Sequence, residues 1–250
     1  MLARHRHRVI LEMLKTQQSL RTIELAKHFE VTDETIRRDL EHLDAEGKLL
    51  RTHGGAVRIE RRAEDLPLQR RLQENRAAKL EIAKKALEFV KPGQTIFFDA
   101  SSTVLALVEM LPDFDLTVIT NSYDCVAPLM SKPSVRLILT GGLFDRVSRS
   151  FGGVVAWTSM RRFAIDRAFF SCNGADPERG ASEAVEFHAE FKENALPLCS
   201  EKILLCDSSK FGVRSSRFFI GMEEIDRFIC DSSADSVFLE RLKARGLDCL

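Results

Sequence analysis

The sequence lacks any uninterrupted apolar run that approaches the roughly 20 residues a helix needs to cross a bilayer. The first residues are basic, with arginine at positions 4, 6 and 8, but no apolar segment of the kind found in signal peptides follows them. We therefore expect a soluble, cytoplasmic protein with no membrane partner.

The sequence also lacks an excess of charge of either sign. Its 250 residues include 37 Lys and Arg and 37 Asp and Glu, which gives a formal net charge of zero. A balanced total neither supports nor excludes a polyanionic partner such as DNA, because binding depends on where the charges lie. The function must therefore be sought in local patterns.

Cysteine motifs that bind metals are missing as well. No two of the six cysteines form a C-x-x-C pair, and no group of cysteine and histidine has the spacing of a zinc site. Several cysteines end or interrupt apolar segments, so we expect buried, reduced thiols without disulfides. We assign no metal and no cofactor. The cysteines are Cys125, Cys172, Cys199, Cys206, Cys230 and Cys249.

Local patterns divide the chain into an N-terminal region with helical periodicity and a longer region in which strands and helices alternate. A charged segment with little periodicity separates them, so we expect domains at 1–57 and 76–250 joined by a linker at 58–75. The alternation indicates a Rossmann-like α/β domain with a mostly parallel sheet. The expected strands are Thr95–Asp99, Leu116–Thr120, Val135–Thr140, Arg167–Cys172, Lys202–Asp207 and Arg227–Asp231. The expected helices are 76–91, 103–111, 122–131, 153–163, 183–196 and 235–245.

The N-terminal region contains apolar residues at helical spacing in three successive segments. Thr22 and Thr32 begin the second and third segments and are suited as N-caps, and Gly47 is suited to end the third. These three helices are expected at about 4–17, 22–29 and 33–46.

The third helix has one apolar face and one polar face. Ile36, Leu40 and Leu43 recur at helical spacing and therefore face the core. The polar side chains of the first turns then point outward, where they can enter a major groove of double-stranded DNA. Arginine reads guanine edges there, and Thr or Glu contacts other bases or phosphates. The candidate DNA-binding residues of this helix are Thr32, Glu34, Thr35, Arg37 and Arg38.

Two short apolar stretches flank Gly54 and Gly55 directly after this helix, which is typical of a β-hairpin. A hairpin behind a recognition helix is a wing, and we expect Arg51 and His53 to contact the DNA backbone or the minor groove. Exposed arginines alone are not specific to DNA binding, and this region is only faintly basic. The ordered combination of turn, capped helix, outward arginine pair and hairpin favours a winged helix-turn-helix.

In the longer region, small and polar residues follow five of the expected strands. The carboxyl ends of parallel strands meet at one edge of an open α/β sheet, and such sheets bind ligands there. A helix N-terminus after residue 101 can hold a phosphate, hydroxyl groups add donors, and a lysine supplies a cation. Carboxylate and amide groups can bind sugar hydroxyls. The candidate effector-binding residues are Asp99, Ser101, Ser102, Thr103, Asn121, Ser122, Gly141, Gly142, Asp176 and Lys210.

The motifs of both regions resemble those of the DeoR-type transcriptional repressors. V-T-D-E-T-I-R-R-D-L at 31–40 and R-T-H-G-G-A at 51–56 look like the recognition helix and the wing of that family. D-A-S-S-T at 99–103, T-N-S at 120–122 and S-K-F-G at 209–212 then follow in the family's order. The resemblance covers nearly the whole chain. It implies a repressor of a carbohydrate-metabolism operon, a sensor domain similar to ribose-5-phosphate isomerase, and release from DNA by a phosphorylated sugar or related metabolite.

Two alternatives remain open. N-G-A-D at 173–176 looks like the D-G-A-D loop of sugar-phosphate isomerases, so the longer region could be an enzyme. Isomerisation needs a positioned general base. In those enzymes the glutamate base follows a Lys-Gly-Gly-rich loop, and we find no such loop near Glu183 and Glu186. We therefore expect no enzymatic activity. The second alternative is an interaction scaffold that binds no small molecule. For a regulator we expect a homo-oligomer, a dimer or tetramer, that presents two recognition helices to repeated or palindromic half-sites.

Overall fold

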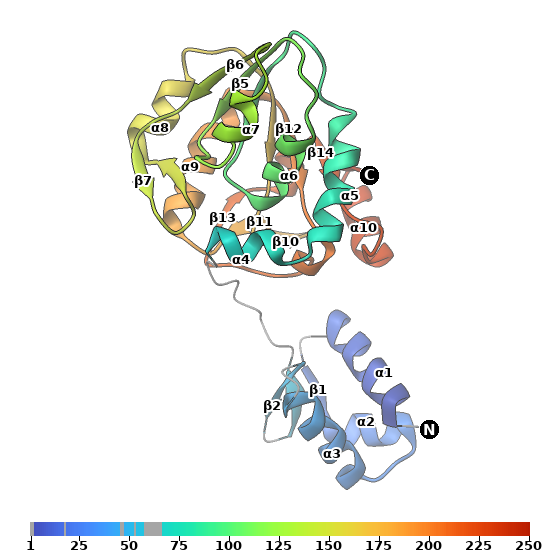
Figure 1. The fold of residues 1–250 in the computed structure, drawn as a ribbon. Helices are drawn as coiled ribbons and strands as arrows, with labels where there is room; N and C mark the ends of the chain where they lie inside the picture. The colour runs from blue at the N-terminus through green and yellow to red at the C-terminus, as the bar shows by residue number, and fades with distance from the viewer. Residues whose placement is uncertain (1–2, 18, 46–47, 53, 58–66) are drawn as a thin grey trace. The chain divides into compact units, whose positions relative to one another are not determined.

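The computed structural model describes residues 3–17, 19–45, 48–52, 54–57 and 67–250. The chain divides into two compact units, Met1–Glu60 and Arg61–Leu250 (Figure 1). Each unit has hydrophobic core residues of its own, with one cluster in the first unit and two in the second. Each can therefore be treated as a folding body with its own stability.

The N-terminal unit combines helices with a small antiparallel sheet. Its strands have the order β1-β3-β2. Ile10, Leu25, Ile36, Leu40 and Leu43 form the centre of the core, and each is almost completely buried. The predicted apolar face of the third helix is thus confirmed. The elements are α1 (Ala3–Thr16), β1 (Ser19–Arg21), α2 (Thr22–Phe29), α3 (Asp33–Ala45), β2 (Leu50–Thr52) and β3 (Gly55–Val57).

Strand β1 was not predicted, and it changes the start of α2. Arg21 occupies the N-cap position without a side-chain capping bond, and Thr22 is the first residue of the helix. The prediction that Thr22 caps this helix was wrong, because residues 19–21 are extended and pair with β3. The cap of α3 is as predicted, since the Thr35 amide donates to Thr32 Oγ1 at 3.3 Å. Gly47, the predicted end of this helix, lies outside the described residues.

The hairpin of β2 and β3 lies where the sequence predicted it, and β3 is also paired with β1. The close approach of β1 to β3 explains why one of the two hairpin residues, Gly55, is a glycine. A Cβ on Gly55 would lie 1.9 Å from the carbonyl oxygen of Leu20, which no side chain can do. A Cβ on Gly54 would meet no atom within 4 Å. Gly55 is therefore required by packing and Gly54 is not.

The predicted linker contains a helix. Residues 58–66 lie outside the described residues, whereas α4 (Leu68–Gln73) is a short helix that contacts α6. Leu68 is buried, and its amide donates to the Val147 carbonyl at 3.3 Å. The second half of the predicted linker is thus attached to the C-terminal unit.

The C-terminal unit is built on a parallel sheet of the order β15-β14-β12-β9-β4-β5-β6. The predicted strands all belong to it. The strands that begin at Thr95, Leu116 and Val135 end within one residue of the predicted position. The strands predicted to begin at Arg167 and Lys202 begin two and three residues earlier. The members are β4 (Thr95–Phe98), β5 (Leu116–Thr120), β6 (Val135–Leu139), β9 (Ile165–Phe170), β12 (Cys199–Leu205), β14 (Arg227–Ile229) and β15 (Asp248–Cys249), of which β15 was not predicted.

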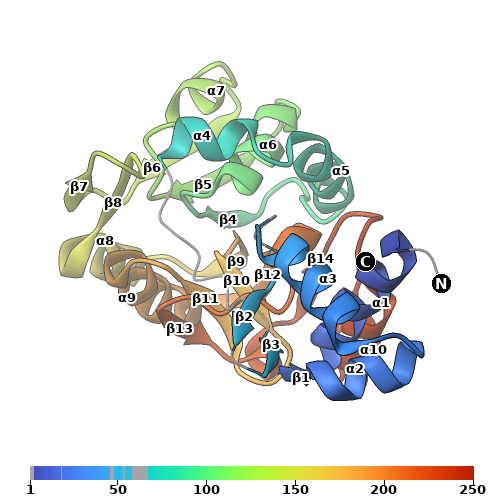
Figure 2. The same cartoon turned by 90° about the horizontal axis from the view of Figure 1, so that it is seen from below.

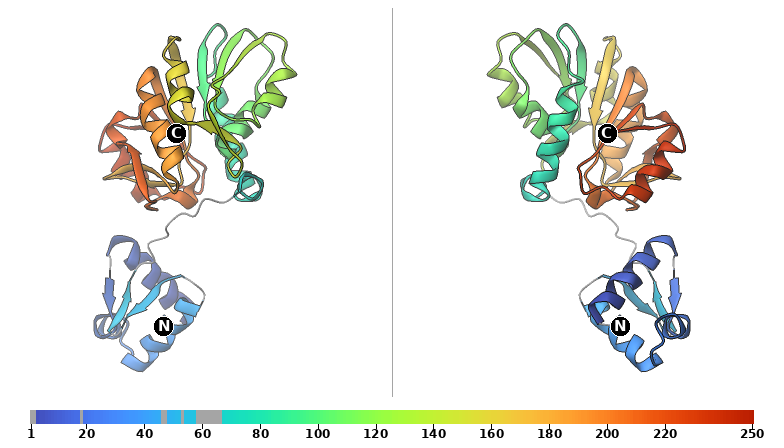
Figure 3. Two further views of the ribbon diagram at one scale, coloured as in Figure 1. Left: turned by 90° about the vertical axis from the view of Figure 1, so that its left-hand side faces the viewer. Right: turned by 90° about the vertical axis from the view of Figure 1, so that its right-hand side faces the viewer.

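Helices cover both faces of this sheet (Figures 2 and 3). Neighbouring residues of one strand point to opposite faces, so Phe97 joins the core under α8, α9 and α10, while Phe98 joins the core under α5, α6 and α7. Burial of these side chains contributes about 1.5–3 kcal/mol each. The helices are α5 (Arg76–Leu87), α6 (Ser102–Met110), α7 (Val126–Met130), α8 (Gly153–Met160), α9 (Glu186–Ala195) and α10 (Ser236–Lys243).

Two smaller antiparallel elements were not predicted. β7 (Leu143–Asp145) and β8 (Ser150–Gly152) form a hairpin, and β10 (Gly174–Asp176), β11 (Gly180–Glu183) and β13 (Arg217–Ile220) form a three-stranded sheet. Both are short and lack the run of β-branched residues that marks a central strand. As a result, the helix predicted at 183–196 begins later, at Glu186. The helix predicted at 122–131 is also shorter, because Ser122 bridges to Ser150.

The six cysteines are reduced, and five are buried while Cys249 is half-buried. Burial raises the pKa of the Cys125 and Cys199 thiols to about 12, so both are protonated at neutral pH. The described residues contain no cluster of three or more His, Cys, Asp or Glu side chains that could hold a metal ion. Across the described ranges, every helix is too short or too polar to traverse a lipid bilayer.

Candidate functional sites

The polar face of α3 is exposed, as the sequence predicted. Glu34, Arg37 and Arg38 are exposed, and 77% of the Arg38 side chain is accessible. Arg38 Nε lies 3.5 Å from Glu34 Oε1, so its charge is partly balanced. Within the described residues, no ion pair of Arg37 is found.

The two threonines at the start of α3 are bonded to each other. Thr32 Oγ1 lies 2.9 Å from Thr35 Oγ1, and it also accepts the Thr35 amide. These contacts fix both hydroxyl groups at the N-terminal end of the helix. Thr32, Asp33 and Glu34 at that end are exposed, and a helix N-terminus of this kind binds phosphate oxygens.

Asp39 fastens α3 to α1, a role that the sequence analysis missed. Its carboxylate accepts from Arg6 Nε at 2.7 Å and lies 2.9 Å from His7 Nε2. Arg6 and Asp39 are both buried. Burial by itself would raise the pKa of Asp39, but the bonds from Arg6 and His7 lower it below the ordinary value. The carboxylate is therefore charged at neutral pH and sets the orientation of the helix.

The hairpin residue Arg51 is held by α3. Its guanidinium lies 2.6 Å from Glu41 Oε1, and its amide donates to Asp44 at 3.2 Å. The side chain keeps about a third of its surface exposed, so it can still reach a partner. His53, the other residue predicted on the wing, lies outside the described residues.

In the C-terminal unit, the ends of three neighbouring strands bring predicted residues together. Asp99 follows β4, and its Oδ2 accepts the Ser171 amide at 3.1 Å. The Ser171 hydroxyl accepts from Lys210 Nζ at 3.1 Å. Ser171 follows β9, and Lys210 lies in a short 3-10 helix (Ser208–Lys210) after β12. The loops at 99–103 and 207–212 are thus joined through a single serine, as the parallel topology predicted.

The Asp99 carboxylate is fully engaged inside the chain. It also accepts from the Ser101 amide at 3.1 Å and lies 2.9 Å from Lys192 Nζ. Lys192 is buried and lies 2.5 Å from Glu183 as well. Burial alone would lower the pKa of Lys192, but the charges of Asp99 and Glu183 raise it above its ordinary value. Asp99 was predicted to bind sugar hydroxyls, and the structure places it in a buried ion cluster.

The start of α6 keeps donors near Asp99. Ser101 is the N-cap, and its Oγ accepts the Val104 amide at 3.1 Å. Ser102 and Thr103 occupy the first turn and are buried. The Thr103 hydroxyl has no hydrogen-bond partner among the described residues. An anion at this helix end would meet hydroxyl groups and the N–H groups of the first turn together.

The loops after β5 and β6 carry a second group of predicted residues. Asn121 Nδ2 donates to the Phe151 carbonyl at 3.0 Å, while its buried Oδ1 has no partner among the described residues. Ser122 Oγ accepts the Cys125 amide at 3.3 Å. Gly141 and Gly142 have positive φ, and a Cβ on Gly142 would lie 2.6 Å from the Gly152 carbonyl oxygen. These loops and the β7–β8 hairpin are therefore packed tightly together.

Asp176 serves a different purpose. Its carboxylate accepts the amides of Glu178 and Arg179 and lies 2.6 Å from Arg214 Nε. Burial by itself would raise the pKa of Asp176, but these bonds lower it. These contacts close the turn between β10 and β11, and the preceding residue, Ala175, bridges to Phe211 in the loop after Lys210.

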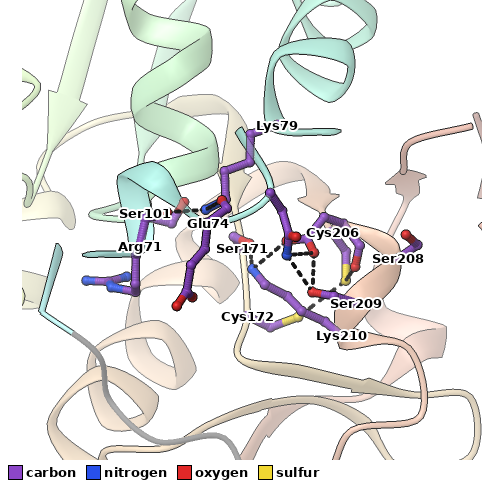
Figure 4. A network of polar contacts seen from close by, with 12 residues as sticks. Arg71, Glu74, Lys79, Ser101, Ser171, Cys172, Cys206, Ser208, Ser209 and Lys210 are labelled. Atoms are coloured by element: carbon purple, nitrogen blue, oxygen red, sulfur yellow. Dashed lines mark hydrogen bonds and ion pairs between the residues drawn. The ribbon is translucent and has the colours of Figure 1, made fainter. Parts of the chain in front are cut away.

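Two residues of the α4–α5 segment, Lys79 and Asn75, were missed by the sequence analysis. Figure 4 shows Lys79 near Arg71 and Glu74. Lys79 is a buried lysine of α5, and its Nζ donates to the carbonyl of Glu74 at 2.8 Å and to that of Arg71. Burial, together with the charge of Lys210, lowers the pKa of Lys79 to about 8. Asn75 has a left-handed backbone, and its Nδ2 donates to Ser209 Oγ at 2.9 Å.

Lys210 and Asp207 form the ionic part of the same cluster. Lys210 Nζ lies 3.5 Å from Asp207 Oδ2, and the Asp207 Oδ1 accepts from Asn75 at 3.1 Å. Burial alone would raise the pKa of Asp207, but the charge of Lys210 lowers it below the ordinary value. In Lys210 the effects are reversed: burial alone would lower its pKa, but the charge of Asp207 raises it above the ordinary value. The Asp207 carboxylate thus acts on two ammonium groups, Lys79 and Lys210, and the charges of Glu74 and Glu183 also act on these lysines.

Two family models match this chain. Residues 6–62 match the DeoR-like helix-turn-helix domain. Residues 74–232 match the DeoR C terminal sensor domain. The chain belongs to the DeoR family. The resemblance seen in the sequence is confirmed, and so is the fold class of a winged helix-turn-helix joined to a mostly parallel α/β domain.

Relatives of this DeoR-family chain are similar over nearly its whole length. The HTH-type transcriptional regulator YulB of Bacillus subtilis is 37% identical, with 97% of this chain and 94% of that protein covered. The L-fucose operon activator of Escherichia coli K12 is 34% identical, with 90% and 94% covered. The transcriptional repressor AccR of Agrobacterium fabrum is 31% identical, with 91% and 89% covered.

This DeoR-family protein is accordingly a DNA-binding transcription regulator and not an enzyme, as predicted. A solved structure of ribose 5-phosphate isomerase A from Methanocaldococcus jannaschii is similar over 55% of each chain, with a TM-score of 0.42 and 17% identity. That likeness is too slight to carry an argument about activity.

Proposed function

We propose that this DeoR-family regulator is a repressor of a carbohydrate-metabolism operon, and that a phosphorylated sugar or related metabolite releases it from its operator. It acts in the cytoplasm as a homo-oligomer, a dimer or tetramer. Relatives named for sugar-linked operons, such as the L-fucose operon activator, support the metabolic assignment. Both an activator and a repressor occur among the relatives, so the direction of regulation is part of the proposal.

The DNA-binding role is assigned to α3 and the β2–β3 hairpin. Arg37 and Arg38 carry their charges on the exposed face, where a major groove offers guanine acceptors. Thr32, Thr35 and Glu34 lie at the N-terminal end of the helix, which favours a phosphate oxygen. Arg51 and His53 extend the contact to the DNA backbone, as a wing does. Asp39 supports these contacts by holding the helix in place.

The effector role is assigned to the strand ends around Lys210, and the pair formed by the buried Lys79 and the half-buried Lys210 carries this assignment. Lys79 and Lys210 both interact with Asp207, and Glu74 acts on Lys79 and Glu183 on Lys210. A dianionic phosphate would be attracted by both ammonium groups and would reach the N-terminal turn of α6 with its hydroxyl groups. Asn121 and Ser122, with Gly141 and Gly142, are assigned to the sugar portion. Asp99 and Asp176 are assigned to holding the loops.

The same lysine offers a route from the effector to the DNA-binding unit. Lys79 donates to the carbonyls at the C-terminal end of α4, which lies in the second half of the predicted linker. A phosphate attracted to the Lys79 ammonium competes with those carbonyls. Its arrival therefore alters the end of α4, and a coupling of about 1–3 kcal/mol is enough for regulation.

The test is a thermal-shift screen of the full chain against sugar phosphates, with inorganic phosphate and unphosphorylated sugars alongside. A specific effector at 100 times its Kd stabilises the native state by about 2.7 kcal/mol. The hit is then added to a complex of the chain with an operator selected from random DNA. We expect the effector to raise the operator Kd.

Lys210→Met is the decisive variant, and Lys243→Met on the exposed end of α10 is its control. Lys210→Met should lose the effector response and keep operator binding, whereas Lys243→Met should behave as the wild type. A chain that binds an operator and responds to no sugar phosphate contradicts the effector part of the proposal. A chain that selects no DNA sequence contradicts the proposal as a whole.

A further inference from the structure

Two buried thiols lie against each other at the carboxyl edge of the parallel sheet. Cys172 Sγ and Cys206 Sγ are 3.8 Å apart, and both residues are free cysteines. Figure 4 shows both side chains next to Lys210. In Cys199 and Cys249, by contrast, the sulfur donates to a carbonyl oxygen of its own segment. Cys172 and Cys206 are therefore placed to react with each other.

The register of the sheet accounts for this contact. β9 and β12 are parallel neighbours, and their final pair is Phe170 with Leu204. Two residues further along each strand, Cys172 lies opposite Cys206, and both join the same core as Phe170 and Leu204. Neighbouring strands are about 4.7–4.9 Å apart. A disulfide bridges Cα atoms that are about 4.4–6.8 Å apart, so the backbone spacing permits one here.

The residues next to the two cysteines hold Lys210. Ser171 precedes Cys172, and its hydroxyl accepts from Lys210 Nζ at 3.1 Å. Asp207 follows Cys206, and its Oδ2 lies 3.5 Å from the same nitrogen. To form a disulfide, the sulfurs must approach from 3.8 Å to about 2 Å, which rotates both side chains and draws the two strand ends together. The position of Lys210 depends on those strand ends.

Burial gives the two sulfurs different tasks. It raises the pKa of Cys206 well above the ordinary value, the neighbouring Cys172 thiol raises it further, and the charge of Lys210 lowers it. Cys206 is completely buried and is therefore a protonated thiol at neutral pH. Cys172 keeps 3% of its surface exposed, so it is the first of the two to meet a small oxidant. Cys206 is then the second sulfur to react.

We propose that Cys172 and Cys206 are a modification site that hydrogen peroxide converts reversibly to a disulfide, and that this disulfide weakens effector binding at Lys210. The second part rests on the proposed function. The cause of the weaker binding is mechanical, because Ser171 and Asp207 move with the cysteines and no longer hold the ammonium group in the same place.

The reaction has two steps. The Cys172 sulfur attacks one peroxide oxygen, the O–O bond breaks, and the released hydroxide takes the thiol proton and leaves as water. The Cys206 sulfur then attacks the sulfenic acid on Cys172, the S–O bond breaks, and a second water carries away the Cys206 proton. Two electrons pass from the sulfurs to the peroxide. A dithiol such as dithiothreitol reverses the change by thiol–disulfide exchange.

Peptide mapping of the full chain tests the modification. The reduced chain is treated with hydrogen peroxide, unfolded in an alkylating reagent and digested with trypsin, which cuts between the two cysteines at Arg179 and Lys202. We expect the peptides of Cys172 and Cys206 to be joined, and to separate when dithiothreitol precedes alkylation. Cys206→Ser should leave a sulfenic acid on Cys172 that dimedone labels. Cys199→Ser, at another buried cysteine, is the matched control and should keep the joined peptides.

Two results overturn the modification. One is a wild-type chain in which the half-buried Cys249 is oxidised while Cys172 and Cys206 are both recovered as thiols. The other is a joined peptide found only in chains that are linked to each other, which electrophoresis without reductant separates from single chains. Neither result depends on the folding of a variant.

Thermal shift with the sugar phosphate that stabilises the reduced chain tests the second part. The oxidised chain should need an about tenfold higher concentration for the same shift, which is within the usual range of coupling between two sites. Dithiothreitol should restore the response. An equal response before and after oxidation overturns the second part. A reduced chain that responds to no sugar phosphate counts against the proposed function, while the peptide map stands.

Discussion

Lys79 Nζ lies 2.8 Å from the carbonyl oxygen of Glu74, so a buried cation holds the C-terminal end of α4. Burial and the nearby charge of Lys210 lower the pKa of Lys79 to about 8. The folded chain therefore holds this proton less tightly than the unfolded chain does. Stability should rise as the pH increases from about 8 toward the ordinary lysine value near 10.5, because the unfolded state binds the extra proton in that window.

Effector binding should depend on pH through the same group. A phosphate beside Lys79 favours its charged form and raises its pKa, so binding takes up a proton at pH 8–9. We expect affinity to fall as the pH rises through about 8, although the phosphate itself is already dianionic above pH 7. Calorimetry at pH 8.5 in two buffers of different ionisation enthalpy measures the proton uptake.

Lys79→Arg separates this effect from other titrations, because arginine stays charged throughout the range. The variant should bind without proton uptake. Lys84, exposed on the opposite part of α5, provides the control Lys84→Arg, which should keep the wild-type uptake. Equal uptake in both variants would show that Lys79 does not meet the effector.

Asp39→Asn should destabilise the N-terminal unit by about 3 kcal/mol, because it leaves the buried Arg6 charge without its carboxylate. The folded pKa of Asp39 is lowered, so its contribution is present above pH 4 and is lost as the pH falls through that lowered value. Hydrogen exchange of residues 3–57 measures the change. Glu41→Gln, which removes an exposed pair with Arg51, should have little effect.

Arg37→Ala should weaken operator binding by about 1–3 kcal/mol if the side chain reads a base. Arg38→Ala should cost less, because Glu34 already balances part of its charge. Neither should lower the melting temperature, since both side chains are exposed. Fluorescence anisotropy with labelled operator measures the affinity, and Arg241→Ala on α10 is the control. Normal binding by both variants would mean that another face contacts DNA.

Gly55→Ala should weaken the N-terminal unit by about 1–3 kcal/mol, since its Cβ would overlap the Leu20 carbonyl and separate β1 from β3. Gly54→Ala is the adjacent control and should be tolerated, because nothing lies within 4 Å of its Cβ. Thermal unfolding of the two variants decides the point. Similar loss in both would indicate a turn effect and not a clash.

The parallel sheet could be predicted because its central strands are buried on both faces and read as short apolar runs. Leu116–Thr120 was predicted without error. The antiparallel elements escaped prediction for the opposite reason. Gly174–Asp176 and Gly180–Glu183 consist largely of small or polar residues, which resemble turns when the partner strand is unknown. Their pairing is a tertiary effect that a local pattern does not contain.

The sequence predicted where the candidate site lies, but it did not predict what each side chain binds. Parallel topology correctly brought Asp99 and Lys210 to one edge, yet the ion cluster that occupies Asp99 involves Lys192, which lies on a distant helix. The sequence did contain a pattern from which the burial of Lys79 could have been predicted. It shares the helical stripe of Ile82, Ala83 and Ala86, which are all buried. A lysine on an apolar stripe indicates a buried cation, and such residues cluster at functional sites.

Asn75 meets two chemical requirements at one position. Its backbone is left-handed, at φ 50°, which favours glycine, asparagine or aspartate. Its side-chain Nδ2 also donates to Asp207 and Ser209. Glycine has no such donor, and aspartate would place a second negative charge next to Asp207. Of these residues only asparagine satisfies both. In a library randomised at this codon and selected for effector response, asparagine should be recovered almost alone.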